Sequence, residues 1–286
     1  ISQIITRNYM KILENKRELD ELLAKIRTNG TKIGLIPTMG SIHNGHLSLV
    51  ENSMKENFFS ITSIFVNPTQ FNDLKDFKKY PQNKKQDIEK LNTVKCDAVF
   101  FPQIEELYPE GIKRKKTISK YRDILCDKFR PGHFDGVTTV VKSLFDIVTP
   151  DAVFFGEKDF QQLKIIKELI KKNNLPIQLI DCPSVRSKNG MSLSSRYNNF
   201  NTNQEILFNQ ISLKVNDCVN LLKKQIDINN LKNLNQYLEE DKKIKVDYLE
   251  VRDDDELLLT QKNKNARLFI SFYIEDIRII DNFKLY

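Results

Sequence analysis

The residues best suited to chemistry are two histidines three positions apart, His43 and His46, in a chain with only 3 histidines. They follow the apolar run Ile33 to Ile36 and stand at the predicted entrance of a helix that begins near Asn44, whose side chain is a candidate cap. The N–H groups and dipole of a first helical turn favour a phosphate, and imidazoles can donate to its oxygens. The pattern indicates phosphate chemistry, and a capped turn with merely polar histidines explains the bare spacing equally well. A zinc pair fits less well, because the helical zinc motif has a longer spacing and no Cys or Glu nearby supplies a third ligand.

Other polar side chains stand where predicted strands end. Gln70 follows the run Ile61 to Val66, and Lys158 follows Ala152 to Phe155, with Gln162 one turn into the next predicted helix. In an open parallel sheet the carboxyl ends of the strands meet at one edge, where ligands bind. A lysine there can reach a phosphate, and a glutamine offers both a donor and an acceptor. A surface salt bridge of Lys158 and an ordinary loop glutamine are the alternatives.

Two glycine-containing segments complete the candidates. Arg130 to Gly136 is predicted to be a loop that carries an arginine and the third histidine, His133. It is interpreted either as an anion-binding or closing loop or as a structural turn. Val185 to Arg196 combines cations with serine hydroxyls, which suits phosphate oxygens but is also typical of an interdomain linker. Neither a Gly-x-Gly-x-x-Gly nor a Walker-type loop occurs, so those two nucleotide sites are not indicated.

The elements that position these residues alternate between strand and helix up to residue 182, after a first predicted helix over 11–26. This alternation predicts an α/β fold with a doubly wound parallel sheet. After Pro183 the pattern changes to helices and then strand-like runs, so we expect two domains, 1–183 and 184–286, the second a smaller α+β domain. The predicted strands are 33–36, 61–66, 98–101, 152–155, 177–182, 246–251, 267–273 and 277–280; the further predicted helices are 84–91, 137–148, 160–172, 203–224 and 230–240.

Composition narrows the function classes. The hydrophobic fraction of 40% is sufficient for a core. The net charge of +7 permits binding of anionic ligands, including nucleic acid. The basic residues are spread out, and the densest run, Lys113 to Lys116, is interpreted as a solvated loop. The 4 cysteines form no Cys-x-x-Cys, which argues against a zinc ribbon or redox pair and favours a reducing compartment. No apolar stretch could span a bilayer and no signal-type core is seen, so we expect a cytoplasmic protein without a membrane partner.

Several motifs together carry a family resemblance. Pro37 to His46 is similar to the His-x-Gly-His signature of the nucleotidyltransferase superfamily. Further blocks follow in order and resemble the pantoate–β-alanine ligase family, in a match that reaches Asp281-Asn282. These blocks are Ser63–Phe71, Arg130–Phe134, Phe155–Leu163 and Leu193–Arg196. The resemblance implies ATP-dependent condensation of pantoate with β-alanine to pantothenate through a pantoyl adenylate, with release of AMP and pyrophosphate.

The same resemblance implies site residues and partners. It assigns the role of catalytic proton donor to His46, pantoate binding to Gln70 and Gln162, and β-alanine binding to Gln70. It implies a Rossmann-like N-terminal domain that binds ATP and pantoate, a C-terminal lid and a cytoplasmic homodimer. We expect Mg²⁺ to accompany ATP, name no protein ligand to a metal, and expect no nucleic-acid partner. The residues it assigns to ATP are Met39, Gly40, Ser41, Ile42, His43, Asn44, Gly45, His46, Gly156, Glu157, Lys158, Asp159, Val185, Leu193, Ser194, Ser195 and Arg196.

The chain departs from the family pattern at several positions. Asn189 stands where an acidic residue usually precedes the glycine, Tyr197 separates Arg196 from an asparagine, and Cys126 to Phe129 replaces a usual Glu-Gly. The last apolar strand has Phe269, Phe272 and Tyr273 where smaller residues are common. Two rival classes stay open: another His-x-Gly-His enzyme, such as a cytidylyltransferase or a tRNA-charging relative, and a non-catalytic basic RNA-binding protein. The lack of an anticodon-type domain and the paired glutamines count against the first, and salt-sensitive RNA affinity would indicate the second.

Overall fold

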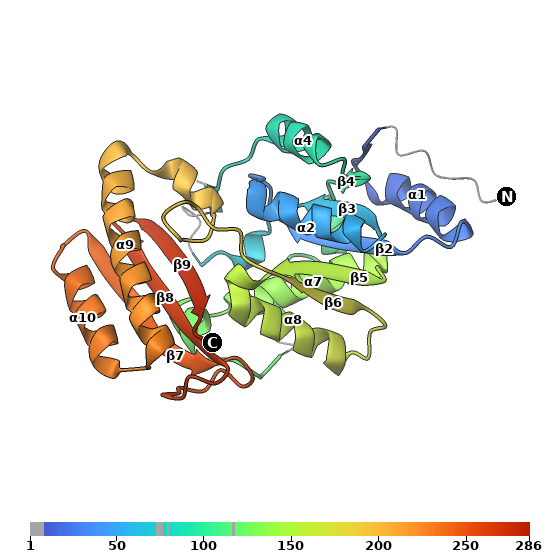
Figure 1. The fold of residues 1–286 in the computed structure, drawn as a ribbon. Helices are drawn as coiled ribbons and strands as arrows, with labels where there is room; N and C mark the ends of the chain where they lie inside the picture. The colour runs from blue at the N-terminus through green and yellow to red at the C-terminus, as the bar shows by residue number, and fades with distance from the viewer. Residues whose placement is uncertain (1–8, 73–76, 79, 116–117) are drawn as a thin grey trace. The chain divides into compact units, whose positions relative to one another are not determined.

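The computed structural model describes residues 9–286 except 73–76, 79 and 116–117 (Figure 1). The chain divides into two compact units. The first contains the residues up to Arg122 together with Arg130–Glu157 and Gln162–Pro183, and the second contains Asp123–Phe129, Lys158–Gln161 and Ser184–Tyr286. Two short segments of the predicted first domain, residues 1–183, therefore belong to the second unit. The ligand-binding and lid roles given to residues 1–183 and 184–286 stay predictions.

The first unit is built on a six-stranded sheet in the order β1-β4-β3-β2-β5-β6, with all neighbouring strands parallel. Residues of the central strands are buried on both faces, as expected for a parallel sheet covered on both sides. The strand order reverses between β2 and β5, so the predicted doubly wound sheet is confirmed, with its topological switch point there. The strands are β1 (Lys11–Leu13), β2 (Ile33–Thr38), β3 (Phe59–Ile64), β4 (Ala98–Phe100), β5 (Ala152–Gly156) and β6 (Gln178–Cys182).

Helices cover this sheet. Helix α2 lies across β2, β3, β5 and β6 (Figure 1), and its Val50 packs in one cluster with Ile36 and Phe154 of the sheet and Leu91 of α4. Gly34 of β2 permits this close approach, because a Cβ there would overlap Ser53 of α2. Helix α7 contacts β2 and α1. The helices of this part are α1 (Lys16–Thr28), α2 (Asn44–Lys55), α4 (Lys84–Thr93), α5 (Ile104–Leu107), α7 (His133–Val148) and α8 (Phe160–Lys172), the last of which begins in the second unit.

The second unit pairs two long helices with an antiparallel sheet in the order β7-β8-β9. Buried side chains of α9 such as Ile211 and Val215 share a core with Leu268, Ile270 and Phe272 of β8. This arrangement confirms the predicted smaller α+β part. Its elements are α6 (Leu125–Phe129), α9 (Thr202–Lys224), α10 (Ile228–Glu239), β7 (Ile244–Asp253), β8 (Ala266–Ile274) and β9 (Ile277–Lys284).

Three local predictions are wrong. Residues 11–13 form strand β1, not the start of a helix, because pairing with β4 overrides their helical periodicity. Pro37 does not end its strand, because β2 continues to Thr38. The pairing of β2 with β5 already stops at Leu35, so the missing N–H of Pro37 removes no hydrogen bond on that side. The segment predicted as a loop up to Gly136 is helical from His133 onward.

Candidate active site

In the first unit, the turn between β2 and α2 is closed by its two histidines. His43, not Asn44, is the N-cap: its Nδ1 accepts from the Gly45 N–H at 3.1 Å, while His46 Nδ1 accepts from the His43 N–H at 3.3 Å. The two rings stack with centroids 4.0 Å apart. Because each Nδ1 is an acceptor, the neutral ring carries its proton on Nε2. Both imidazoles are thereby fixed in the tautomer that presents an Nε2–H donor.

A buried carboxylate that the sequence did not single out holds the same turn. Asp87 of α4 is 1% exposed, and its two oxygens accept from the N–H groups of Ser41 at 2.9 Å and Ile42 at 2.7 Å. Lys90, one turn later, donates to the Ile42 carbonyl at 2.7 Å. Ser41 and Gly40 both have positive φ, so the turn adopts a conformation that needs this support. Only the contact in three dimensions distinguishes Asp87 from any other helical aspartate.

Gln70 is held at both its side chain and its backbone. Its Oε1 accepts from Asn67 Nδ2 at 3.1 Å, and its Nε2 lies 2.9 Å from the Met39 sulfur. His133 Nδ1 and Arg130 Nη2 lie 2.7 and 3.2 Å from the Gln70 carbonyl oxygen. The structure therefore brings the predicted pantoate residue beside the first residue of the predicted ATP-binding turn. Arg130 and His133 also support the Gln70 backbone, as the alternative of a structural turn predicts, while the anion-binding or closing role stays a prediction.

The backbone around Gln70 is fixed by residues that sequence reasoning missed. Tyr108 Oη donates to Asn67 Oδ1 at 2.5 Å and lies 3.0 Å from Thr69 Oγ1, and burial raises the pKa of Tyr108. Arg114, an exposed residue of the basic run predicted as a solvated loop, donates to the Thr69 carbonyl at 2.6 Å and so also holds this backbone; Lys116 lies outside the described residues. Gly136 of α7 packs directly on this loop, since a Cβ there would stand 2.7 Å from Gln70 N.

The remaining first-unit candidates follow β5. Gly156 ends that strand, Glu157 follows it, and Gln162 is half-buried in the first turns of α8. Since β5 is the neighbour of β2 at the switch point, Gly156 and the His43–His46 turn follow the two strands between which a doubly wound sheet binds ligands.

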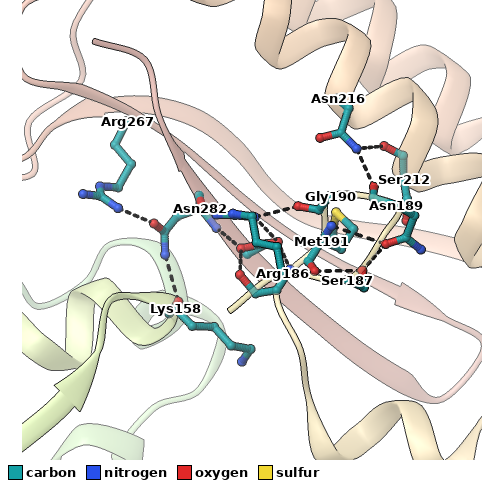
Figure 2. Close-up of polar contacts among 12 residues, drawn as sticks. Lys158, Arg186, Ser187, Asn189, Gly190, Met191, Ser212, Asn216, Arg267 and Asn282 are labelled. Atoms are coloured by element: carbon teal, nitrogen blue, oxygen red, sulfur yellow. Dashed lines mark hydrogen bonds and ion pairs between the residues drawn. The ribbon is translucent and has the colours of Figure 1, made fainter. Parts of the chain in front are cut away.

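The second unit contains the other predicted ATP-binding residues. Lys158 Nζ lies 3.8 Å from the Asp159 carboxylate, so the alternative of a salt bridge is observed, and the Lys158 carbonyl accepts from Asn282 Nδ2 at 2.8 Å. Leu193 N donates to the Val185 carbonyl at 3.0 Å. Figure 2 shows the intervening loop tied to β9 through Asn282 and to α9.

The following turn is set by Ser194 and Arg196. Ser194 Oγ caps the 3₁₀ turn Ser195–Asn199 by accepting from Arg196 N at 3.3 Å. Arg196 Nη1 donates to the Arg278 carbonyl of β9 at 3.1 Å. The guanidinium of Arg196 is therefore attached to the same strand as the preceding loop.

Two departures from the family pattern have a structural account. Asn189 Oδ1 accepts from the Met191 N–H at 3.3 Å and from the Ser187 hydroxyl, so it serves as the turn's acceptor in place of an acidic side chain. Tyr197 stacks on Phe200 at 5.4 Å and packs against Phe208 in the core of the second unit, and this burial raises its pKa. Tyr197 therefore contributes to the core of the second unit.

In the part of the chain that the structure describes, no group of three or more His, Cys, Asp or Glu side chains is arranged to hold a metal ion. No helix in the same part is long and apolar enough to cross a membrane.

Comparison with known proteins shows which family the chain belongs to. The family model described as pantoate-beta-alanine ligase matches residues 11–284. The chain is 36% identical to the pantothenate synthetase of Caldicellulosiruptor bescii over 276 residues, covering 96% of this chain and 98% of that one. It resembles the crystal structure of pantothenate synthetase from Thermus thermophilus with a TM-score of 0.88 and 31% identity, covering 97% and 100% of the two chains. A pantoate-beta-alanine ligase from Francisella tularensis, complexed with beta-gamma ATP and beta-alanine, gives a TM-score of 0.84 and 35% identity over 97% and 98%. The chain belongs to the pantoate–β-alanine ligase family.

Proposed function

We propose that the protein condenses pantoate with β-alanine at the expense of ATP, through a pantoyl adenylate, and releases AMP and pyrophosphate. The observation that carries this proposal is the contact of Gln70 Nε2 with the Met39 sulfur at 2.9 Å. Gln70, to which the proposal assigns pantoate, is therefore a neighbour of the turn that carries His43 and His46, and this proximity supports the proposal. The activity of the curated relatives and the ATP and β-alanine named for the Francisella enzyme support it.

In the first step, a pantoate carboxylate oxygen attacks the α-phosphorus of ATP, and the bond from that phosphorus to the pyrophosphate oxygen breaks. Two anions must approach, so the site has to neutralise charge and align the attacking and leaving groups. The Nε2–H groups of His43 and His46 would donate to phosphate oxygens, and His46 would act as the proton donor. Lys158 and Arg196 add positive charge in the proposal.

In the second step, the amine of β-alanine attacks the acyl carbon of the adenylate, AMP leaves, and the amine loses a proton. The proposal gives Gln70 the additional task of contacting β-alanine, as a side chain with both donor and acceptor atoms can. Closure of residues 184–286 as a lid would keep water from the mixed anhydride.

Mg²⁺ is part of the proposal as the companion of ATP. The described residues contain no ready-made metal cluster, and Mg²⁺ commonly binds through substrate phosphates and water with few protein ligands. When bound to the triphosphate, the ion supplies charge neutralisation for the departing pyrophosphate.

A homodimer and a cytoplasmic location complete the proposal, both supported by the family resemblance. A homodimer would have twice the mass of the 33.5 kDa chain in light scattering at assay concentration. A monomer mass there would contradict this part of the proposal without touching the chemistry.

A coupled assay for AMP, run with and without each acid, tests the activity. We expect AMP to form only when pantoate, β-alanine and ATP are all present, in a one-to-one ratio to pantothenate. ADP as the nucleotide product, or AMP formation that needs no pantoate, would contradict the proposal.

A further inference from the structure

Asp281, near the C-terminal end of β9, is a fully buried carboxylate, with a side chain 0% exposed. Its Oδ1 accepts from Ser192 Oγ at 2.6 Å and its Oδ2 from Ser192 N at 2.8 Å. Arg186 Nη1 donates to Oδ2 at 3.1 Å, and the Asn282 N–H donates to Oδ1 at 2.8 Å. The carboxylate thus holds both ends of the loop that precedes Leu193–Arg196, with each oxygen accepting two hydrogen bonds.

The next residue, Asn282, holds a different segment. Its Nδ2 donates to the Lys158 carbonyl at 2.8 Å, and its Oδ1 accepts from Arg267 Nη1 at 2.6 Å (Figure 2). Arg267 is itself fixed by both carboxylate oxygens of Asp254 at 2.9 and 3.0 Å. Since Arg267 can only donate, it forces the amide nitrogen of Asn282 toward Lys158.

Consecutive residues of a strand point to opposite faces of the sheet, which explains how neighbours can hold different segments. Asp281 is paired with Ile270, a member of the core beneath α9, and Asn282 is paired with Phe269. Phe160, which follows the Lys158 turn, packs on the Phe269 ring at 6.0 Å. Strand β9 therefore runs between the two segments and contacts one on each face.

We infer that Asp281 and Asn282 are positioning residues that set the Lys158–Asp159 turn and the Leu193–Arg196 loop in a fixed mutual arrangement for binding ATP. The inference rests on the proposed function, which assigns both segments to the nucleotide. The same strand also receives Arg196, whose guanidinium donates to the Arg278 carbonyl. Neither Asp281 nor Asn282 has to touch the nucleotide in this role.

The test uses near-isosteric variants of the full chain. Asn282→Asp keeps the acceptor for Arg267 but turns a carboxylate oxygen toward the Lys158 carbonyl, and Asp281→Asn turns an NH₂ toward N–H donors. We expect each to raise the Kd of ATP, measured by titration calorimetry, by about ten-fold or more while the Kd of pantoate stays unchanged. Ser212→Ala is the matched control, because this buried hydroxyl donates within α9 to the Phe208 carbonyl and contacts neither segment.

The melting temperature of each variant is recorded alongside. If Asn282→Asp does not fold, the ATP affinity of Asn282→Ala, a neutral truncation, tests the inference in its place. Unchanged ATP affinity in folded variants, or ATP and pantoate affinities that fall together, would overturn the inference. Pantoate-dependent AMP formation by the unaltered chain separates the two levels. If the unaltered chain forms no AMP with pantoate while the ATP affinities of the variants change as expected, the proposed function fails and the positioning role stands.

Discussion

His43 and His46 have two tasks at the scale of single residues: they close the terminus of α2, and they are proposed to act on the phosphates. A His-x-x-His pair takes the place of the usual Ser-x-x-Glu capping box here. The sequence located this helix entrance correctly but gave the cap to Asn44, because asparagine is the commoner capping residue. The choice depends on backbone conformation: His43 is extended with φ of −136°, and Asn44 is already helical.

The double task shapes the first prediction. His46→Ala should lower the rate of adenylation on the order of 10²-fold or more, as for a positioned acid or charge stabiliser. His46→Gln restores an acceptor at the third helical position, so it should recover the stability of the cap but not the rate. Stopped-flow measurement of AMP or pyrophosphate formation and thermal unfolding separate the two effects. Near-normal turnover by either variant would show that the imidazole has no catalytic role.

The glutamines supply the second prediction. Gln70→Ala or Gln162→Ala should raise the pantoate concentration needed for half-saturation more than that of ATP, since losing one buried hydrogen bond costs about 1–3 kcal/mol. Gln161→Ala is the matched control. Its amide bonds Cys126 N at 3.0 Å and the Ile124 carbonyl at 2.9 Å, so its loss should reduce stability alone. Pantoate saturation that is unchanged in both test variants would mean that pantoate binds elsewhere.

At the scale of elements, the packing of α7 on the Thr69–Gln70 loop decides where Gln70 lies. Replacing glycine by alanine inside a helix normally stabilises it by about 1 kcal/mol. At Gly136 the sign should reverse, because the added Cβ would overlap the Thr69 carbonyl and stand 2.7 Å from Gln70 N. We expect Gly136→Ala to destabilise the protein by about 1–3 kcal/mol and to raise the KM for pantoate.

Urea unfolding and steady-state kinetics check this third prediction. Ser143→Ala, further along α7, is the control: its hydroxyl bonds within the helix to Thr139 O at 3.1 Å, so pantoate kinetics should be unchanged. A Gly136→Ala variant with normal pantoate kinetics would contradict the view that α7 positions Gln70.

Whether a helix or strand could be predicted depends on whether the residues that determine it are close together in the sequence. Helices α4, α8 and α9 begin and end close to the predicted residues, because periodicity and caps are local signals. Strand β1 was missed because three residues become a strand only through pairing with β4. The start of α7 at His133 was missed because a glycine with φ of 78° precedes it in place of a capping side chain.

At the scale of the whole molecule, buried thiols link stability to pH. Burial raises the pKa of both Cys182 and Cys218 from 9.0 to about 11. A raised pKa means that the folded state keeps protons that the unfolded state has lost. The resulting stabilisation is complete below pH 9 and disappears as the pH rises through about 11.

The fourth prediction concerns the urea concentration at the midpoint of unfolding. We expect it to fall between these pH values, and to fall less in the Cys182→Ala, Cys218→Ala double variant than in the unaltered chain. Each midpoint is compared with its own value below pH 9, the ordinary thiol pKa, so that the cavities left by the substitutions cancel. An equal fall in both proteins would assign the effect to other buried groups, such as Tyr108, whose pKa burial also raises.

The site as a whole was only partly predictable. Motifs located the β2–α2 turn, the Gln70 loop and the segments after β5 and Pro183, because each is a short local pattern. The contacts that hold them in place were not predictable: Asp87 lies in an ordinary helical context, and Asp281, although part of the family match, meets Arg186 across 95 residues of sequence. Such support depends on long-range contacts, which no spacing in the sequence reports.

The central claim is that pantoate is activated at the α-phosphorus of ATP. Pantoate labelled with heavy oxygen in its carboxylate tests it most directly, with mass spectrometry of the nucleotide and phosphate products. The adenylate mechanism predicts that one labelled oxygen appears in AMP and none in pyrophosphate. Label in inorganic phosphate with ADP as the nucleotide product would show attack at the γ-phosphorus and contradict the account.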